Sequence, residues 1–195
     1  MNLPNKLSLI RICLIPVFVL FFFLTALPYN YVYAAVVFAV AAVTDFLDGR
    51  IARKRGLVTN LGKFLDPIAD KVLVATAFVL MLTKYEIFGL FGHGFYVAGA
   101  VCVCLILARE LIISAFRQIA AANGVVLAAD MLGKLKTNAQ DYCVVALIAS
   151  ASFAGTAQKV ISVIGLALFA AAVILTVISG VSYIVKNPAV LKTEK

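Results

Sequence analysis

Residues 44–71 have the sequence TDFLDGRIARKRGLVTNLGKFLDPIADK and lie between two long apolar runs. The stretch carries four of the nine acidic residues in the chain, which are Asp45, Asp48, Asp66 and Asp70. An ionisable side chain within a membrane-embedded segment is costly and usually serves a function. The position of these carboxylates therefore has to be explained together with the apolar runs around them.

The composition is that of a membrane protein. The chain has 195 residues, of which 64% are hydrophobic and only 13% charged, and its mean hydropathy is +1.08. A soluble domain of this length is nearer half apolar, because polar groups must cover its surface. We therefore expect residues 1–195 to form one membrane-embedded domain, most of whose surface faces lipid.

Six apolar stretches are each long enough to cross a bilayer, which takes about 20 residues. Because backbone polar groups cannot stay unpaired in hydrocarbon, each stretch is predicted to be helical. The predicted fold is an all-α integral membrane protein with six transmembrane helices, and the segment NLPNKLSLIR can lie along the membrane surface before the first of them. The expected spans are Leu7–Leu27, Tyr31–Arg53, Gly62–Leu82, Gly94–Arg117, Leu135–Phe153 and Val160–Val185.

The basic residues predict the orientation. With a cytoplasmic N-terminus, thirteen Lys and Arg residues fall on the cytoplasmic side and two on the other. This asymmetry places both termini in the cytoplasm and makes the chain a multi-pass protein of the cell membrane. Because the basic residues cluster beside apolar spans, the net charge of +8 indicates contact with anionic lipid and not with nucleic acid.

The two aspartate pairs are predicted to lie close together. Asp45 and Asp48 share a face near the cytoplasmic end of the second helix, and Asp66 and Asp70 share one near the start of the third. About eight loop residues, 54–61, join these helices, so the helices are antiparallel neighbours. Both pairs then lie at a similar depth, facing the cytoplasm.

Four carboxylates at close quarters repel one another and take up protons unless cations compensate them. Two divalent ions, Mg²⁺ or Mn²⁺, can be bridged by shared carboxylates. The alternative is a set of ordinary ion pairs with nearby basic residues such as Arg50, Arg55 and Lys63. We favour the metal interpretation, because the four aspartates form two helical pairs within membrane spans.

The pattern Asp45-x2-Asp48-Gly49-x2-Ala52-Arg53-x8-Gly62-x3-Asp66-x3-Asp70 resembles the complete signature of the CDP-alcohol phosphotransferase family. Three further runs resemble those of bacterial phosphatidylglycerophosphate synthases within this family. They are Leu3-Pro4-Asn5-x2-Ser8-x2-Arg11, Ala108-Arg109-Glu110-x3-Ser114-x2-Arg117 and Gly133-Lys134-x-Lys136-Thr137.

The resemblance implies transfer of the phosphatidyl group from CDP-diacylglycerol to sn-glycerol 3-phosphate, with release of CMP. It implies that the four aspartates hold two divalent cations and that Asp70 also acts as general base on the acceptor hydroxyl. It further implies a homodimer, and contacts to the CDP-lipid from Gly49, Ala52, Arg53, Thr59, Gly62 and Asn5.

A phosphorylated acceptor needs positive charge, and arginine can grip a phosphate with two hydrogen bonds. The candidates near the cytoplasmic ends of the fourth and fifth helices are Arg109, Arg117, Lys134 and Lys136. Alternatively, the last three only orient the chain in the membrane, and Arg109 pairs with Glu110.

Two other functions stay open at this point. A sibling enzyme of the same family would use another acceptor, such as phosphatidylglycerol, serine or inositol phosphate. A small cation transporter could also use four aspartates, but it would spread its charges through the membrane depth, whereas these lie at one end.

Overall fold

The computed structural model describes residues 3–55, 60–122 and 131–191, with side chains at 9–44, 68–122, 131–188 and 190. Within these ranges all regular structure is helical, which confirms the predicted all-α class. Three short helices lie between or after the long ones: α4 (Tyr85–Phe88), η1 (Gly89–Phe91) and η2 (Pro188–Leu191). The six long helices are α1 (Leu3–Phe23), α2 (Asn30–Arg55), α3 (Asn60–Leu82), α5 (His93–Ala122), α6 (Met131–Ser150) and α7 (Gly155–Lys186).

Each predicted span coincides with one long helix, although the ends differ. α1 stops at Phe23, four residues before the expected end, because the side chain of Asn30 caps it. The Asn30 Nδ2 group donates to the carbonyl oxygens of Phe21 at 3.2 Å and Phe22 at 3.0 Å, which satisfies two C-terminal carbonyls. Residues 3–11 of the segment NLPNKLSLIR, expected along the membrane surface, form the first turns of α1, and their position relative to a membrane stays a prediction.

Two helices are long and apolar enough to cross a membrane on their own, namely α5 and α7. A third candidate is the pair Ile68–Leu82 and Tyr85–Phe91, which is bent by 91° at its break. Within the described residues, Leu9–Phe23 and Asn30–Thr44 are shorter apolar helices. The chain is therefore a helical protein with membrane-spanning helices, while the number six stays a prediction.

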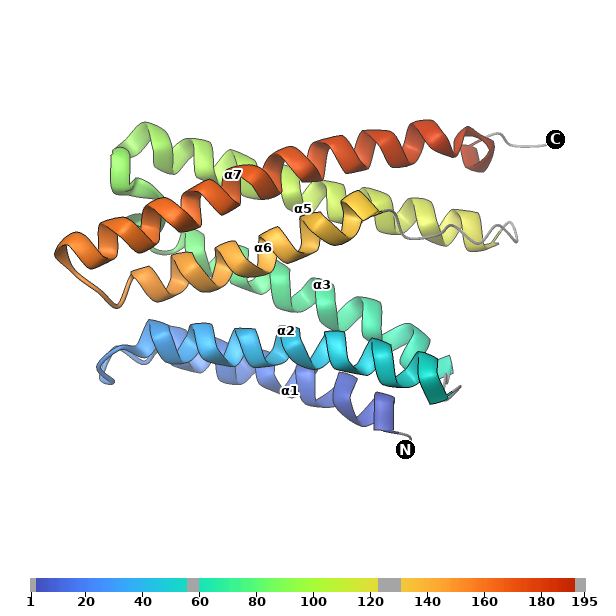
Figure 1. The fold of residues 1–195 in the computed structure, drawn as a ribbon, viewed down its shortest axis with the longest axis horizontal. Coiled ribbons are helices and arrows are strands. Elements are labelled where there is room, and N and C mark those ends of the chain that lie inside the picture. Colours follow the sequence, from blue (N-terminus) through green and yellow to red (C-terminus); the bar gives the residue numbers. More distant parts are fainter. Residues whose placement is uncertain (1–2, 56–59, 123–130, 192–195) are drawn as a thin grey trace.

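The helices form a bundle of antiparallel neighbours (Figure 1). The most extensive contact joins α6 to α7, followed by that between α1 and α2, and α2 also packs against α6. Figure 1 shows the start of α1 and the end of α7 at the same end of the bundle. The C-terminal part of α2 and the N-terminal part of α3 lie at that end too, so the opening aspartate motif lies there.

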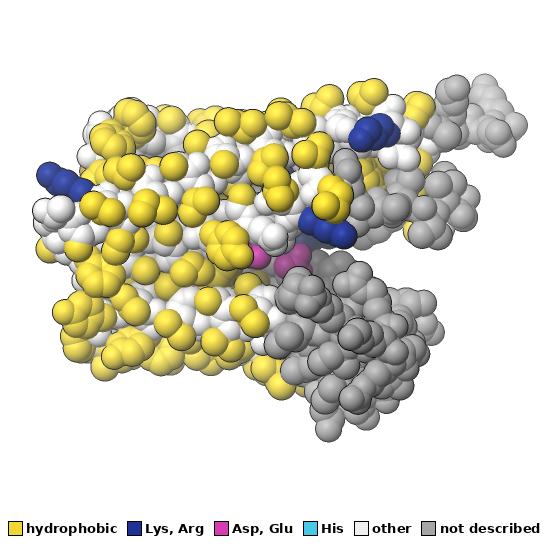
Figure 2. Space-filling view, viewed as in Figure 1, with side chains coloured by type: hydrophobic (Ala, Val, Ile, Leu, Met, Phe, Trp, Pro, Cys, Tyr) yellow, Lys and Arg dark blue, Asp and Glu magenta, His cyan; other side chains and the backbone are white. Residues whose placement is uncertain are grey.

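Aromatic side chains fill the core between α3, α4 and α7. Phe78 of α3 and Phe88 of α4 both contact the ring of Phe169 on α7, with ring centroids 6.0 Å and 5.1 Å apart. Outside this core, large apolar side chains stay exposed along every long helix, and hydrophobic side chains are spread over the described part of the face in Figure 2. A surface of this kind suits lipid better than water.

The contact between α6 and α7 depends on a glycine. A Cβ atom at Gly165 would lie 2.7 Å from Cγ and Cδ2 of the fully buried Leu147. Small residues at such crossings let membrane helices approach closely. Gly94 of α5 offers a matched comparison, because a Cβ atom at that position would meet nothing within 4 Å among the described residues.

We expect Gly165→Ala to lower the free energy of unfolding by about 1–3 kcal/mol, the usual cost of overpacking a tight core. The measurement is thermal unfolding of the purified protein in detergent. Gly94→Ala should leave the midpoint unchanged or raise it slightly. Equal midpoints for Gly165→Ala and the parent chain would contradict the close helix approach.

Candidate active site

A pocket of about 180 Å³ lies between α3, α5 and α6. Charged and apolar side chains share its wall, so it can receive a polar group next to an apolar one. Figure 2 shows that the acidic side chains visible on one face lie in a hollow, beside a basic side chain. The lining residues are Asp70, Lys71, Val74 and Ala75 of α3, Leu107, Glu110 and Leu111 of α5, and Lys136, Thr137 and Gln140 of α6.

Asp70 is the one predicted metal ligand whose side chain is described, and it is half-buried in the pocket wall. Asp45 and Asp48 lie on α2 and Asp66 lies on α3, but their side chains are outside the described residues. Among the side chains that the structure describes, no three His, Cys, Asp or Glu residues form a group that could hold a metal ion. The predicted four-aspartate cage is therefore not tested.

The helix ends do put the two aspartate pairs at a matching depth. Asp45 and Asp48 lie about 15 Å and 10 Å before the end of α2, at 1.5 Å per residue. Asp66 and Asp70 lie about 9 Å and 15 Å after the start of α3 by the same rise. Since only residues 56–59 join the two helices, the pairs lie at corresponding levels of an antiparallel hairpin.

The predicted contacts to the nucleotide lipid fall in the same part of the chain. Gly49, Ala52 and Arg53 belong to the helical backbone of α2, and Gly62 to that of α3. Asn5 lies in the first turn of α1. The side chains at these positions, and the whole of Thr59, lie outside the described residues, so these roles stay predictions.

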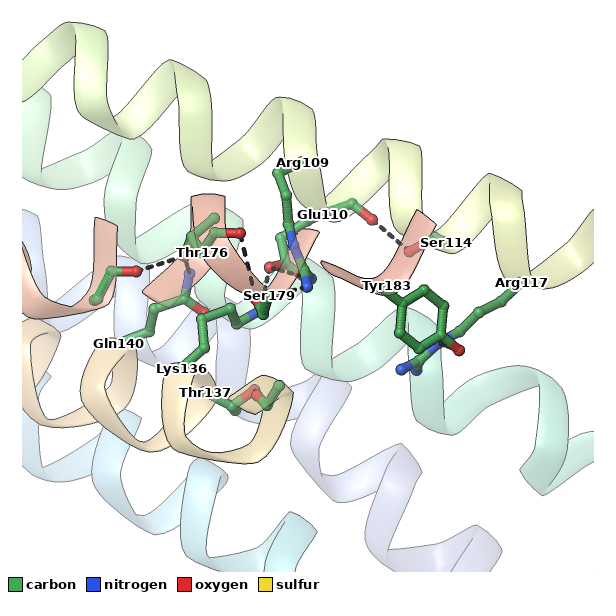
Figure 3. Close-up of polar contacts among 12 residues, drawn as sticks. Arg109, Glu110, Ser114, Arg117, Lys136, Thr137, Gln140, Thr176, Ser179 and Tyr183 are labelled. Carbon is green, nitrogen blue, oxygen red and sulfur yellow. Dashed lines mark hydrogen bonds and ion pairs between the residues drawn. The ribbon is translucent and has the colours of Figure 1, made fainter. Parts of the chain in front are cut away.

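A charged cluster joins α5 to α6 (Figure 3). The Nζ atom of Lys136 donates a hydrogen bond to Oε1 of Glu110, and Nη1 of Arg109 lies 3.5 Å from the same oxygen atom. The side chain of Lys136 is only 5% exposed. The alternative in which Arg109 pairs with Glu110 is therefore observed, and a lysine from the next helix shares the carboxylate.

Helix α7 holds Arg109 from the other side. Nη2 of Arg109 donates to Oγ of Ser179 at 2.9 Å. A Cβ atom at Gly180 would lie 3.1 Å from Cγ of Arg109, so the glycine makes room for the arginine stem. Nε of Arg109 is buried without a hydrogen-bond partner among the described residues.

The other two predicted acceptor residues lie elsewhere. Arg117 donates through Nε to the hydroxyl oxygen of Tyr183 at 3.0 Å, and its guanidinium carbon lies 5.0 Å from the centre of that ring. Lys134 has an exposed side chain on α6. Of the four basic residues predicted to bind the acceptor phosphate, Lys136 alone is among those that line the pocket.

Sequence reasoning did not assign a site role to several polar residues that lie at or behind the pocket. Gln140 of α6 lines it and donates to Oγ1 of Thr176 on α7 at 3.5 Å. The sequence predicts Glu110 only as a partner for Arg109. Both residues belong to helices that the sequence predicts to span the membrane, and a polar residue in such a place signals a buried partner or a site.

Comparison with known proteins gives a consistent result over nearly the whole chain. A family model described as CDP-alcohol phosphatidyltransferase matches residues 1–181. The chain is 38% identical to the CDP-diacylglycerol–glycerol-3-phosphate 3-phosphatidyltransferase of Bacillus subtilis (strain 168), over 98% of each chain. It is 40% identical to the protein of the same name from Escherichia coli (strain K12), over 94% of this chain and 93% of that one.

A third relative with this name comes from Rickettsia bellii (strain RML369-C). It is 36% identical, over 93% of each chain. In all three comparisons the aligned part includes almost the full length of both proteins, so the likeness is not confined to the aspartate motif.

Proposed function

This chain belongs to the CDP-alcohol phosphatidyltransferase family, as its motif predicted, and on that premise we propose that it joins CDP-diacylglycerol to sn-glycerol 3-phosphate. The products are phosphatidylglycerophosphate and CMP. The relatives named for this reaction support the proposal. The observation that carries it is the pocket, in whose wall the carboxylate of Asp70 and the ammonium group of Lys136 both lie.

The pocket suits a small phosphorylated alcohol as the acceptor. Its volume of about 180 Å³ is below that of pockets for drug-sized ligands. Lys136 offers a positive charge for the phosphate, while Thr137 and Gln140 can exchange hydrogen bonds with hydroxyl groups. Arg109 lies 3.5 Å from the Glu110 carboxylate oxygen that Lys136 also contacts, so a second cation is close to that side of the pocket.

Asp70 is proposed to accept the proton of the attacking acceptor hydroxyl. Two divalent cations, Mg²⁺ or Mn²⁺, would neutralise charge on the transferring phosphoryl oxygens and orient that hydroxyl when bound. Asp45, Asp48, Asp66 and Asp70 would hold them, and the matching depth of the two aspartate pairs on α2 and α3 fits this arrangement. The residues that hold the CDP portion would be Gly49, Ala52, Arg53, Thr59, Gly62 and Asn5.

The proposed setting is the bacterial cell membrane, with six spans and the pocket open to the cytoplasm. The aspartate motif, the start of α1 and the end of α7 lie at the same end of the bundle (Figure 1), and the basic residues favour the cytoplasm for that end. The water-soluble acceptor then enters from the cytoplasm, while the acyl chains of the lipid stay in the bilayer. Residues 1–195 act as one domain in this proposal, which includes a homodimer.

The function is tested by supplying purified protein with CDP-diacylglycerol, Mg²⁺ and one acceptor at a time. We expect CMP release with glycerol 3-phosphate and background release with phosphatidylglycerol, serine or inositol phosphate. Chelation with EDTA should abolish release, and added Mg²⁺ or Mn²⁺ should restore it. CMP release with another alcohol and none with glycerol 3-phosphate would assign the chain to a sibling activity.

Asp70→Asn tests the proposed base. The amide has nearly the size of the carboxylate but cannot accept the proton, so we expect kcat to fall by about 10²–10⁴-fold, the usual contribution of general base catalysis. Binding of CDP-diacylglycerol should be partly retained. Glu86→Gln in α4, an exposed acidic side chain, is the control, and full activity of Asp70→Asn would remove Asp70 from the mechanism.

Arg117→Ala tests whether Arg117 binds the acceptor phosphate although it does not line the pocket. We expect the KM for glycerol 3-phosphate to rise by about tenfold, because a hydrogen bond to a charged group contributes about 1.5–3 kcal/mol. Tyr183→Phe separates the two roles of this arginine, since it removes only the hydroxyl that Arg117 contacts. An unchanged KM in Arg117→Ala would mean that Arg117 does not bind the acceptor phosphate and only contacts Tyr183 on α7.

A further inference from the structure

We propose that Glu110 is a positioning residue for the acceptor site. Its carboxylate holds the ammonium group of Lys136 at the pocket wall, so that an incoming phosphate meets a cation already in place. The inference deepens the proposed function and rests on it. It explains why an acidic residue, Glu110, lines a pocket that is proposed to bind the phosphate of the acceptor.

One oxygen atom carries the arrangement. Oε1 of Glu110 accepts the hydrogen bond from Nζ of Lys136 and lies 3.5 Å from Nη1 of Arg109. The two cations come from different helices, 27 residues apart in the chain by their numbers. Figure 3 shows the ends of both basic side chains directed toward the same place. Glu110 therefore joins α5 to α6 at the pocket.

Lys136 depends on this carboxylate more than Arg109 does. Arg109 is also held by Ser179 through a hydrogen bond of 2.9 Å and fits against Gly180. For Lys136, the hydrogen-bond partner among the described residues is Glu110. Without it, Lys136 would be left with the weaker attraction of Asp70, which lines the same pocket, and its flexible four-carbon stem would let its charge turn toward water.

Two effects of Glu110 on phosphate binding oppose each other. Its negative charge repels the phosphate, but it also keeps two cations together that would otherwise repel one another. Arg109, Lys136 and Glu110 carry a net charge of +1, so the cluster still attracts an anion. The order imposed on Lys136 outweighs the repulsion in this proposal, because binding to a preformed site avoids the cost of ordering a long side chain.

The test compares the parent chain with Glu110→Gln, which keeps the shape of the side chain and removes its charge. We expect the KM for glycerol 3-phosphate to rise by about tenfold, as for the loss of one charge-assisted hydrogen bond. The KM for CDP-diacylglycerol should stay within about twofold, since only the acceptor side changes. Glu86→Gln removes an exposed carboxylate on α4 and should leave both KM values unchanged.

A double-mutant cycle shows whether Glu110 acts through Lys136. In Lys136→Met the positive charge is gone, so a further Glu110→Gln change should raise the KM for glycerol 3-phosphate by less than about twofold. If the double variant instead raises the KM for glycerol 3-phosphate by the product of the two single-variant factors, Glu110 acts independently of Lys136. That result would overturn the proposal. An unchanged or lower KM in Glu110→Gln alone would overturn it as well.

A purely structural role gives a different result. Loss of folded protein lowers the active fraction and hence the apparent kcat, and it leaves both KM values as they were; that outcome overturns the proposal. If Glu110→Gln cannot be purified in folded form, Glu110→Asp replaces it, because the shorter carboxylate keeps the charge but draws it back from Lys136. A raised acceptor KM in Glu110→Asp supports the proposal, and an unchanged one contradicts it.

Failure of the proposed function is visible separately. If the parent chain releases no CMP with glycerol 3-phosphate, the proposed reaction is wrong whatever the variants do. If the parent is active and the KM values of Glu110→Gln match it, only the role of Glu110 is wrong.

Discussion

The structure depends on one constraint, which is that a charge inside an apolar helical bundle must meet a compensating group. Glu110, Lys136 and Arg109 meet this requirement together, through a single carboxylate oxygen. Removing one member of such a set leaves another charge uncompensated in a medium that solvates it poorly. The cluster therefore links α5 to α6 at the level of the pocket.

Helix α7 supplies the polar partners that complete this arrangement. Thr176, Ser179 and Tyr183 follow one another at spacings of three and four residues, so they share one face of the helix. All three are buried, and they contact Gln140, Arg109 and Arg117 respectively. The otherwise apolar α7 thus presents a narrow polar stripe to the two helices that carry the basic residues.

Hydropathy predicted the six long helices because each had to be both apolar and about 20 residues long. It did not predict their ends. The capping of α1 by Asn30 needs the three-dimensional turn at residues 24–29. Helices α5 and α7 have 30 and 32 residues, so they continue beyond their apolar centres into polar turns, where hydropathy carries no signal.

The site was partly predictable from the sequence, because local patterns along single helices mark some of its residues. Asp70 and Lys136 follow from local patterns, a helical pair of aspartates and a basic residue at a helix end, and both line the pocket. The pairing of Lys136 with Glu110 spans 26 residues, and that of Arg117 with Tyr183 spans 66. No spacing rule along one helix reaches so far, because such pairs depend on how the helices pack.

Among the described residues, the carboxylates of Asp70 and Glu110 line the pocket, and their neighbours support different proposed roles. Glu110 is paired with two cations that the chain itself supplies, which fits a positioning role. Asp70 lies on α3, one turn after Asp66 on the same helix face, and this spacing of two aspartates suits the proposed metal site. Two acidic residues in one cavity can thus serve different steps, because their environments set what each carboxylate can do.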